Sequence, residues 1–182
     1  MDAQLSELCD RLHSHDPQLR LDAAEHLVQV AERDPQRITE GVDDIRRAAD
    51  DPTAMVRVKT TYILTLIAEE NPYTLRSAVS DLRRWLHDEE DAVKLNASNV
   101  LMNISEECPE EVVPTVDELV RLLRTELSPE FRDDILYHST VALSNAAEEY
   151  PQETVSAVDS VVPLLTEDSV EVKINSSYLL FI

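Results

Sequence analysis

The chain has 182 residues, of which 37 are Asp or Glu and 16 are Lys or Arg, giving a formal charge of −21 at pH 7. This charge argues against a nucleic acid partner, because phosphate binding depends on clustered basic side chains. No stretch approaches the roughly 18 apolar residues that a membrane span requires, so we expect no membrane association and no secretory signal.

A short phrase ending in proline recurs along the chain. Its copies occupy residues 31–35, 68–72, 105–109 and 147–151. The prolines are separated by 37, 37 and 42 residues, and a spacing in this range is typical of stacked helical repeats.

Apolar and small residues flank each proline at steps of three, four and seven, which return side chains to one face of a helix. Each repeat is therefore predicted to be two helices joined at the proline, a residue suited to a helix start because it lacks an amide donor. A second set, Pro17, Pro52 and Pro129, is expected to open the other helix of three repeats. In chain order we predict helices at 3–13, 17–33, 36–49, 52–70, 73–87, 91–107, 110–126, 129–149, 152–166 and 169–182.

The pattern Asp-Pro-x-x-x-Arg-x-x-Ala/Thr-x-x-x-Leu is clear in residues 16–27 and looser around Pro52, Arg57 and Thr61. It resembles the HEAT-repeat family, and the resemblance covers essentially the whole chain. It implies an all-α fold, a right-handed α-solenoid of about five antiparallel helix pairs in a HEAT/armadillo-like superhelix. We expect a single domain, 1–182, with repeats near 1–35, 36–72, 73–109, 110–151 and 152–182.

The resemblance also implies a hydrogen-bond ladder between neighbouring repeats, formed by acidic and basic residues near the start of each second, inner helix. The matching residues are Asp16, Arg20, Arg57, Lys94 and Lys173. In the fourth repeat the basic position falls on Leu136, with Arg132 one helical turn earlier. The longer interval of 42 residues arises in this repeat.

One face of the inner helices is polar, and by resemblance it lines the concave side where HEAT proteins bind partners. The candidate residues are Lys59, Tyr62, Asn96, Asn99, Asn103, His138, Asn145, Asn175 and Tyr178. Two interpretations stay open. The amides bind a protein or peptide, with Tyr62 and Tyr178 as aromatic anchors, or they bond between repeats and face water.

A basic ridge is predicted on the outer helices, at matching places in three repeats. It consists of Arg46, Arg47, Arg83, Arg84, Arg121 and Arg124. These arginines either contact phosphate or an acidic partner, or they pair with nearby carboxylates and the negative ends of their helices.

The sequence offers no pattern for chemistry. The two histidines of residues 13–15 lack a neighbouring cluster of metal ligands, and Cys9 and Cys108 have no histidine at a catalytic spacing. We therefore expect no catalytic residue, metal ion or cofactor. The predicted function is a non-enzymatic scaffold that binds a protein or peptide on its concave face; the alternative is a nucleic-acid-associated protein that uses the arginine ridge.

Composition also suggests an environment. Only Lys59, Lys94 and Lys173 are lysine, and an excess of carboxylates with scarce lysine resembles the proteins of salt-accumulating haloarchaea. The alternative is an ordinary acidic solenoid, since net charge bears on solubility and not on fold. Two distant cysteines suit a reducing cytoplasm. The chain closes on the apolar residues 178–182, for which two explanations stay open: a longer natural chain, or docking of a second copy or another protein.

Overall fold

The computed structural model describes residues 3–182, and these form two compact units that we treat separately. The N-terminal unit ends at Ala78, and the C-terminal unit is Val79–Ile182. Within residues 3–182 the regular structure is helical throughout, without a β-strand. None of the helices in this range has both the length and the apolar character needed to cross a membrane.

The N-terminal unit contains two long inner helices, α2 and α5, which pack against each other, with α1 against α2 and α4 against α5. Its elements are α1 (Ala3–Leu12), α2 (Pro17–Ala31), α3 (Pro35–Ile38), the 3-10 helix η1 (Thr39–Gly41), α4 (Val42–Ala48), α5 (Ala54–Glu70) and η2 (Pro72–Ala78).

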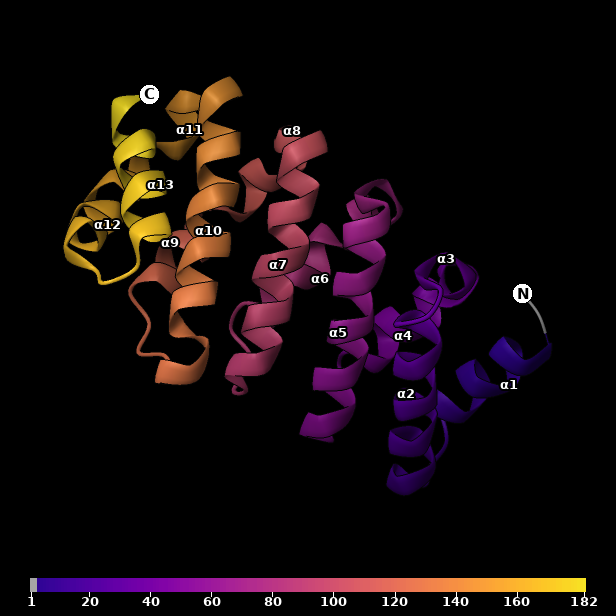
Figure 1. The fold of residues 1–182 in the computed structure, drawn as a ribbon. Helices are drawn as coiled ribbons and strands as arrows, with labels where there is room; N and C mark the ends of the chain where they lie inside the picture. The colour runs from indigo at the N-terminus through magenta and orange to yellow at the C-terminus, as the bar shows by residue number, and fades with distance from the viewer. Residues whose placement is uncertain (1–2) are drawn as a thin grey trace. The chain divides into compact units, whose positions relative to one another are not determined.

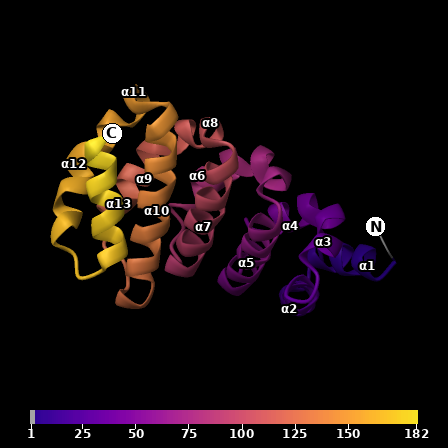
Figure 2. The ribbon, with the colours of Figure 1, turned by 45° about the horizontal axis from the view of Figure 1, so that its top comes forward.

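The C-terminal unit has three inner helices, α7, α10 and α13, that lie side by side in both views, with shorter helices behind them (Figures 1 and 2). Its elements are α6 (Val79–Trp85), α7 (Asp91–Glu107), α8 (Pro109–Val112), η3 (Val113–Thr115), α9 (Val116–Leu123), α10 (Pro129–Glu149), α11 (Pro151–Thr154), η4 (Val155–Ala157), α12 (Val158–Val161), η5 (Val162–Thr166) and α13 (Val170–Phe181). The all-α architecture of paired helices predicted from the repeat is confirmed.

The inner helices follow the predicted boundaries closely, and α7 and α10 match them at both ends. The predicted start at Pro52 is wrong by two residues, because α5 begins at Ala54. The amide of Thr53 donates to the Asp51 carboxylate at 2.7 Å, which holds the chain in a turn before the helix begins.

The outer helices at 36–49, 73–87, 110–126 and 152–166 were predicted to be continuous, and this is wrong: each is divided into short α and 3-10 segments. Hydroxyl groups mark the breaks, since Thr39 donates to the carbonyl of Gln36 and Thr115 to that of Val112. Such bonds bend helices. Pro114 adds to the effect because it has no amide hydrogen to offer the helix.

A leucine eight residues before each repeat proline forms the core in both units. The four leucines are Leu27, Leu64, Leu101 and Leu143, and each is at most 1% exposed. Burying one such side chain stabilises the fold by about 1.5–3 kcal/mol. The repeat register therefore places the same residue type at the same enclosed site.

The packing of α1 depends on the single glycine of the chain, Gly41. A Cβ atom at this position would lie 2.8 Å from the sulfur of Cys9, so a larger residue would push α1 away. Burial, together with the charges of Asp44 and Asp10, raises the pKa of the Cys9 thiol to about 11. Cys9 and Cys108 are both buried free thiols.

Candidate functional site

The basic residues of the predicted ladder share one structural position, the fourth residue of an inner helix. These residues are Arg20, Arg57, Lys94, Arg132 and Lys173. In the fourth repeat the position is occupied by Arg132 and not by Leu136, because α10 begins at Pro129 and is longer than the other inner helices. The position is set by distance from the helix start and not by distance from the repeat proline.

Arg20 connects its own repeat to the next one. Its Nε donates to Asp51 Oδ2 at 2.5 Å and its Nη2 donates to Asp51 Oδ1 at 3.1 Å. The two side chains are only 11% and 6% exposed. The carboxylate of Asp16 has another role: it accepts the amide of Gln18 at 2.9 Å and caps α2.

The same link recurs in the C-terminal unit. Arg132 donates from Nη1 and Nη2 to the two carboxylate oxygens of Glu167, at 2.7 and 2.8 Å. Lys94 instead pairs with Asp91 at 2.7 Å, and Asp91 accepts the amide of Ser128 in the following repeat at 2.7 Å. A carboxylate thus joins each of these basic residues to the next repeat.

The two remaining basic residues differ. Arg57 donates to the carbonyl of Asp51 at 3.0 Å, which binds the start of α5 to the turn before it. The ammonium group of Lys173, on the last inner helix, makes no hydrogen bond or ion pair with any residue in the range 3–182.

The acidic partner was missed because it lies in the loop before the next inner helix, three residues ahead of the helix start. Asp51 precedes α5 by three residues, and Glu167 precedes α13 by three. The sequence carries an acidic residue at the same offset before α7 and α10, at Asp88 and Glu126. This repeated acid is the signal that could have identified the partner.

Charge pairing controls the ionisation of Asp51. Burial alone would raise its pKa, but hydrogen bonds from Arg20 and from Thr53 outweigh burial and hold the pKa below its ordinary value. The Arg132 guanidinium likewise lowers the pKa of Glu167. Both carboxylates are therefore charged when they link the repeats.

The inner face of the N-terminal unit carries two of the candidate binding residues. Lys59 lies 3.4 Å from the carboxylate of Glu25 on α2. Tyr62 is 37% exposed, and its pKa is raised by partial burial and by the charges of Glu32 and Glu69. An exposed aromatic ring therefore lies in an acidic environment.

The asparagines of the C-terminal unit are partly used within the protein. Asn103 donates to both the carbonyl and the side chain of Asn99 at 2.9 and 3.0 Å, and Asn145 donates to Ser105 across α10 and α7 at 2.9 Å. Asn96 is buried. The amide nitrogen of Asn175 is buried and has no partner among residues 3–182.

His138 lies between α10 and α7, with its Nδ1 3.3 Å from the Ser98 hydroxyl. Burial lowers the pKa of His138, against smaller opposing effects of Asp134 and the Leu95 backbone. The imidazole is therefore a neutral group that helps to join two inner helices.

Tyrosines and carboxylates also meet in the C-terminal unit. The Tyr178 hydroxyl, on α13, donates to the Glu148 carboxylate at 2.5 Å, and the ring is 45% exposed. Tyr137, which the sequence analysis missed, is 37% exposed. It lines a cavity of about 420 Å³ with Asp133, Asp134, Ser169 and Glu171. The signal for Tyr137 was its place among acidic residues.

The arginines of the predicted ridge mostly bond to their surroundings. Three of them reach the next outer segment: Arg46 to Ser77 (3.0 Å), Arg83 to Glu118 (2.7 Å) and Arg124 to Ser160 (2.7 Å). Arg47 and Arg84 pair with Asp44 and Asp81 on their own helices. Arg121 alone of the six makes no side-chain hydrogen bond or ion pair with any residue in 3–182.

The last repeat exposes apolar side chains. They are Val155, Val158, Val162, Leu165, Val170, Ile174, Phe181 and Ile182. Leu165 is 37% exposed, whereas Leu86 at the matching place in an earlier repeat is fully buried.

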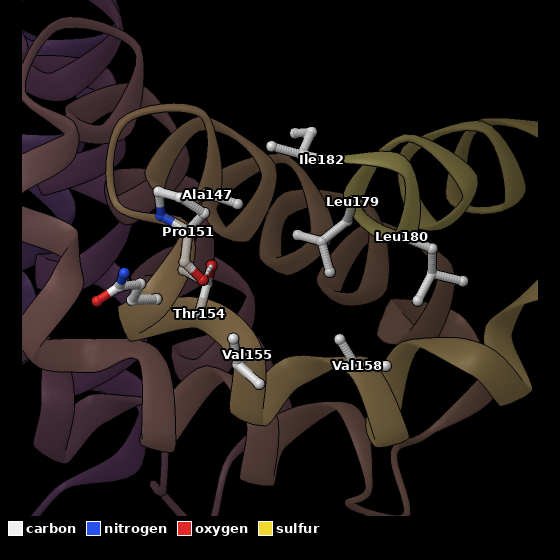
Figure 3. Close-up of a pocket in the computed structure, with 9 residues that line it drawn as sticks. Ala147, Pro151, Thr154, Val155, Val158, Leu179, Leu180 and Ile182 are labelled. Carbon is white, nitrogen blue, oxygen red and sulfur yellow. Dashed lines mark hydrogen bonds between the residues drawn. The ribbon is translucent and has the colours of Figure 1, made fainter.

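A pocket of about 260 Å³ opens beside these residues (Figure 3). In the close-up, Leu179 and Leu180 on α13 are directed toward Val155 and Val158 on the opposite wall. This pocket is apolar and so differs from the acidic surroundings of the tyrosines.

The side chains that commonly bind metal ions are dispersed over the described part of the chain. Across residues 3–182, no three His, Cys, Asp or Glu side chains are grouped as metal ligands. His13 contacts Asp44 at 3.2 Å on the surface of the N-terminal unit.

The sequence of residues 33–180 matches the Cnd1 family model, described as non-SMC mitotic condensation complex subunit 1. No curated protein matches the chain.

Designed and engineered proteins are among the solved structures with a similar fold. A computationally designed armadillo repeat protein for modular peptide recognition aligns at 23% identity with a TM-score of 0.84, covering 97% of this chain and 80% of that one. A designed armadillo repeat protein in complex with peptide (KR)4 aligns at 22% identity with a TM-score of 0.81, covering 98% of this chain and 81% of that one. An engineered protein aligns at 24% identity with a TM-score of 0.79, covering 99% of this chain and 78% of that one. These matches establish a HEAT/armadillo-type α-solenoid fold.

The link between Arg20 and Asp51 gives a test by pH. We expect Asp51→Asn to lower the free energy of unfolding at pH 7 by about 2 kcal/mol, because it removes a hydrogen bond between charged groups. The folded pKa of Asp51 lies below the ordinary value of 3.8. Its contribution is therefore complete above about pH 4 and is lost as the pH falls further.

Urea unfolding from pH 7 to pH 2 measures the difference in stability between the wild type and Asp51→Asn, which should begin to shrink near pH 4 and continue to shrink as the pH falls through the folded pKa of Asp51. Asp10→Asn, at an exposed site of the same unit, is the matched control and should leave stability nearly unchanged. A difference that is constant with pH would contradict the assignment.

Proposed function

This chain belongs to the Cnd1 family, non-SMC mitotic condensation complex subunit 1, and we propose that it is a non-enzymatic scaffold that binds an extended, basic segment of a protein partner. Each unit has its own binding surface on its inner face: the exposed side of α5 in the N-terminal unit, and the exposed side of α7, α10 and α13 in the C-terminal unit. The observation that carries the proposal is the association of exposed tyrosines with carboxylates on both units.

Such sites suit Lys and Arg side chains. An aromatic face attracts a cation with about 0.5–1 kcal/mol at exposed sites, and a neighbouring carboxylate adds an ion pair. Tyr62 lies near Glu32 and Glu69, and Tyr178 bonds to Glu148. The net charge of −21 would also speed the encounter with a basic segment.

The amides of the inner face suit the backbone of the bound segment. Asn99 and Asn103 on α7 are half-buried, so they offer polar atoms on the inner face of the C-terminal unit, and the hydrogen bonds from Asn103 to Asn99 hold them in place. A designed armadillo repeat protein of similar fold binds the peptide (KR)4. This supports a basic peptide as the class of ligand to test.

The nucleic-acid alternative has less support. Five of the six ridge arginines bond to serine or to a carboxylate. A phosphate would have to displace these partners in a protein that is strongly acidic, and each displacement reduces the gain from binding.

Peptide binding can be measured directly. We expect a fluorescein-labelled (Lys-Arg)4 peptide to bind the full chain, and Tyr62→Ala and Tyr178→Ala each to weaken binding by about 0.5–2 kcal/mol, because each removes a cation–π contact. Fluorescence anisotropy at fixed ionic strength gives the affinity, and circular dichroism confirms that helicity is unchanged.

Tyr73→Ala is the matched control, because Tyr73 is 53% exposed but lies on the outer segment η2. It should bind the peptide like the wild type. If Tyr73→Ala weakens binding as much as Tyr62→Ala, attraction is to the overall charge and the inner face is not the site.

We also propose that the protein works in the cytoplasm of a cell with high internal salt. The surplus of carboxylates supports this, because like charges repel within the folded chain and salt screens the repulsion. The two buried free thiols are compatible with a reducing compartment.

We therefore expect the midpoint of thermal unfolding to rise between low and molar KCl, because the Debye length falls to about 3 Å at 1 M. Circular dichroism followed over temperature gives the midpoint at each concentration. Equal midpoints in low and molar KCl would contradict adaptation to high salt.

The apolar surface of the last repeat is proposed to contact the same surface of a second copy. In earlier repeats the position of Leu165 is buried, as at Leu86, so the exposed surface has the pattern of a contact between helical layers. The opposite terminal helix, α1, exposes the polar residues Gln4, Glu7 and Asp10. Pairing of two apolar surfaces is therefore favoured over head-to-tail contact.

Sedimentation velocity tests this contact. We expect the full chain to sediment as a dimer at micromolar concentration, and the double variant Ile174→Ser with Phe181→Ser to sediment as a monomer, because it removes two exposed apolar side chains (61% and 88% exposed). Met55→Ser, at a 50% exposed site of the other unit, is the control and should remain dimeric. A monomeric wild type would refute the contact.

A further inference from the structure

A groove between α1 and α2 has an unusual charge for this protein. Its volume is about 290 Å³, and residues at helical spacing on the two helices line it. Leu8 and Val30 supply apolar contacts, Gln4 and Gln29 supply amides, and Arg11 and Arg33 supply positive charge.

Arg11 and Arg33 give this groove its positive charge. The chain has only 16 Lys and Arg against 37 Asp and Glu, and most of its arginines bond to a carboxylate, a carbonyl or a hydroxyl. The guanidinium groups of Arg11 and Arg33 make no hydrogen bond or ion pair with any residue between 3 and 182. Two cations in one groove, both without a partner in the described part of the chain, indicate a site for an anion.

The arginines lie toward opposite ends of the groove. Arg37 donates to the Gln4 side chain at 3.1 Å, which places the start of α1 beside the chain that follows α2, where Arg33 lies. Arg11 is seven residues further along α1, about 10 Å at a rise of 1.5 Å per residue. In an extended peptide every second side chain faces the same way, so residues four apart present their side chains on one face with a separation of about 13 Å, which the long side chains of the two arginines can span.

We propose that this groove binds an acidic segment of a protein partner, with two carboxylates four residues apart on Arg11 and Arg33. An apolar side chain between the carboxylates contacts Leu8 and Val30, and the amide of Gln29 is available to the peptide backbone. Arg can bind a carboxylate through two parallel hydrogen bonds, which gives the contact both strength and geometry.

Other charges at the groove affect the choice of anion. Glu7 also lines the groove, as does His26, so the two arginines and one carboxylate give a local formal charge of +1 with His26 neutral. The chain as a whole carries −21. Its field repels a phosphate dianion more than a carboxylate, which favours a carboxylate as the ligand.

A peptide of defined sequence tests the site. The probe is fluorescein-labelled Ser-Glu-Ser-Leu-Ser-Glu-Ser with a blocked C-terminus, titrated with the full chain in fluorescence anisotropy. We expect Arg11→Gln and Arg33→Gln each to weaken binding about two- to five-fold, the range for an exposed ion pair. The double variant should weaken it about ten-fold, and added salt should weaken wild-type binding.

Arg121→Gln is the matched control, since Arg121 also lacks a partner among residues 3–182 but lies on α9. It should bind the probe like the wild type, and all variants should keep wild-type helicity. Equal binding of a probe with Gln in place of Glu would overturn the proposal, as would equal weakening by Arg121→Gln. Displacement of the probe by equimolar inorganic phosphate would overturn the choice of carboxylate.

Discussion

The contact between successive repeats is the constraint on which the rest of this protein depends. A single pair of helices encloses too little apolar surface to be stable, so each pair must be covered by its neighbour. Buried apolar side chains, the repeat leucines among them, supply this stabilisation. The charged links, such as Arg20 to Asp51 and Arg132 to Glu167, orient one repeat on the next, because they join the start of one inner helix to the loop before the following inner helix.

The contact between repeats also divides the polar side chains into two classes: those that bond within the protein and those that remain on the surface for a partner. Asn145, His138 and three of the six ridge arginines bond to a neighbouring element. Tyr62 and Tyr178 of the inner face remain exposed. Arg11 and Arg33 line the groove between α1 and α2. The surfaces left for partners are therefore few, and they differ in charge: acidic around the tyrosines, cationic at α1 and α2, and apolar on the last repeat.

Much of the fold could be predicted from the sequence, because period and helical spacing are local properties. The predicted limits of α7 and α10 match the structure, and the repeated leucines are buried as their register requires. The breaks in the outer helices could not be read from apolar spacing, since hydroxyl groups and Pro114 cause them. The roles of the polar residues were harder to predict from the sequence. Asp51 and Arg20, for example, are 31 residues apart, and their contact depends on how the repeats pack.

The fourth repeat shows how such a chain can change length. Helix α10 has 21 residues and α7 has 17, a difference close to one turn of 3.6 residues. Arg132 keeps its place from the helix start, and Leu143 keeps its place before Pro151. Insertion of one or two residues would rotate one end against the other by about 100° or 200°. Evolution can therefore lengthen these helices by whole turns, whereas smaller insertions are tolerated only in the loops.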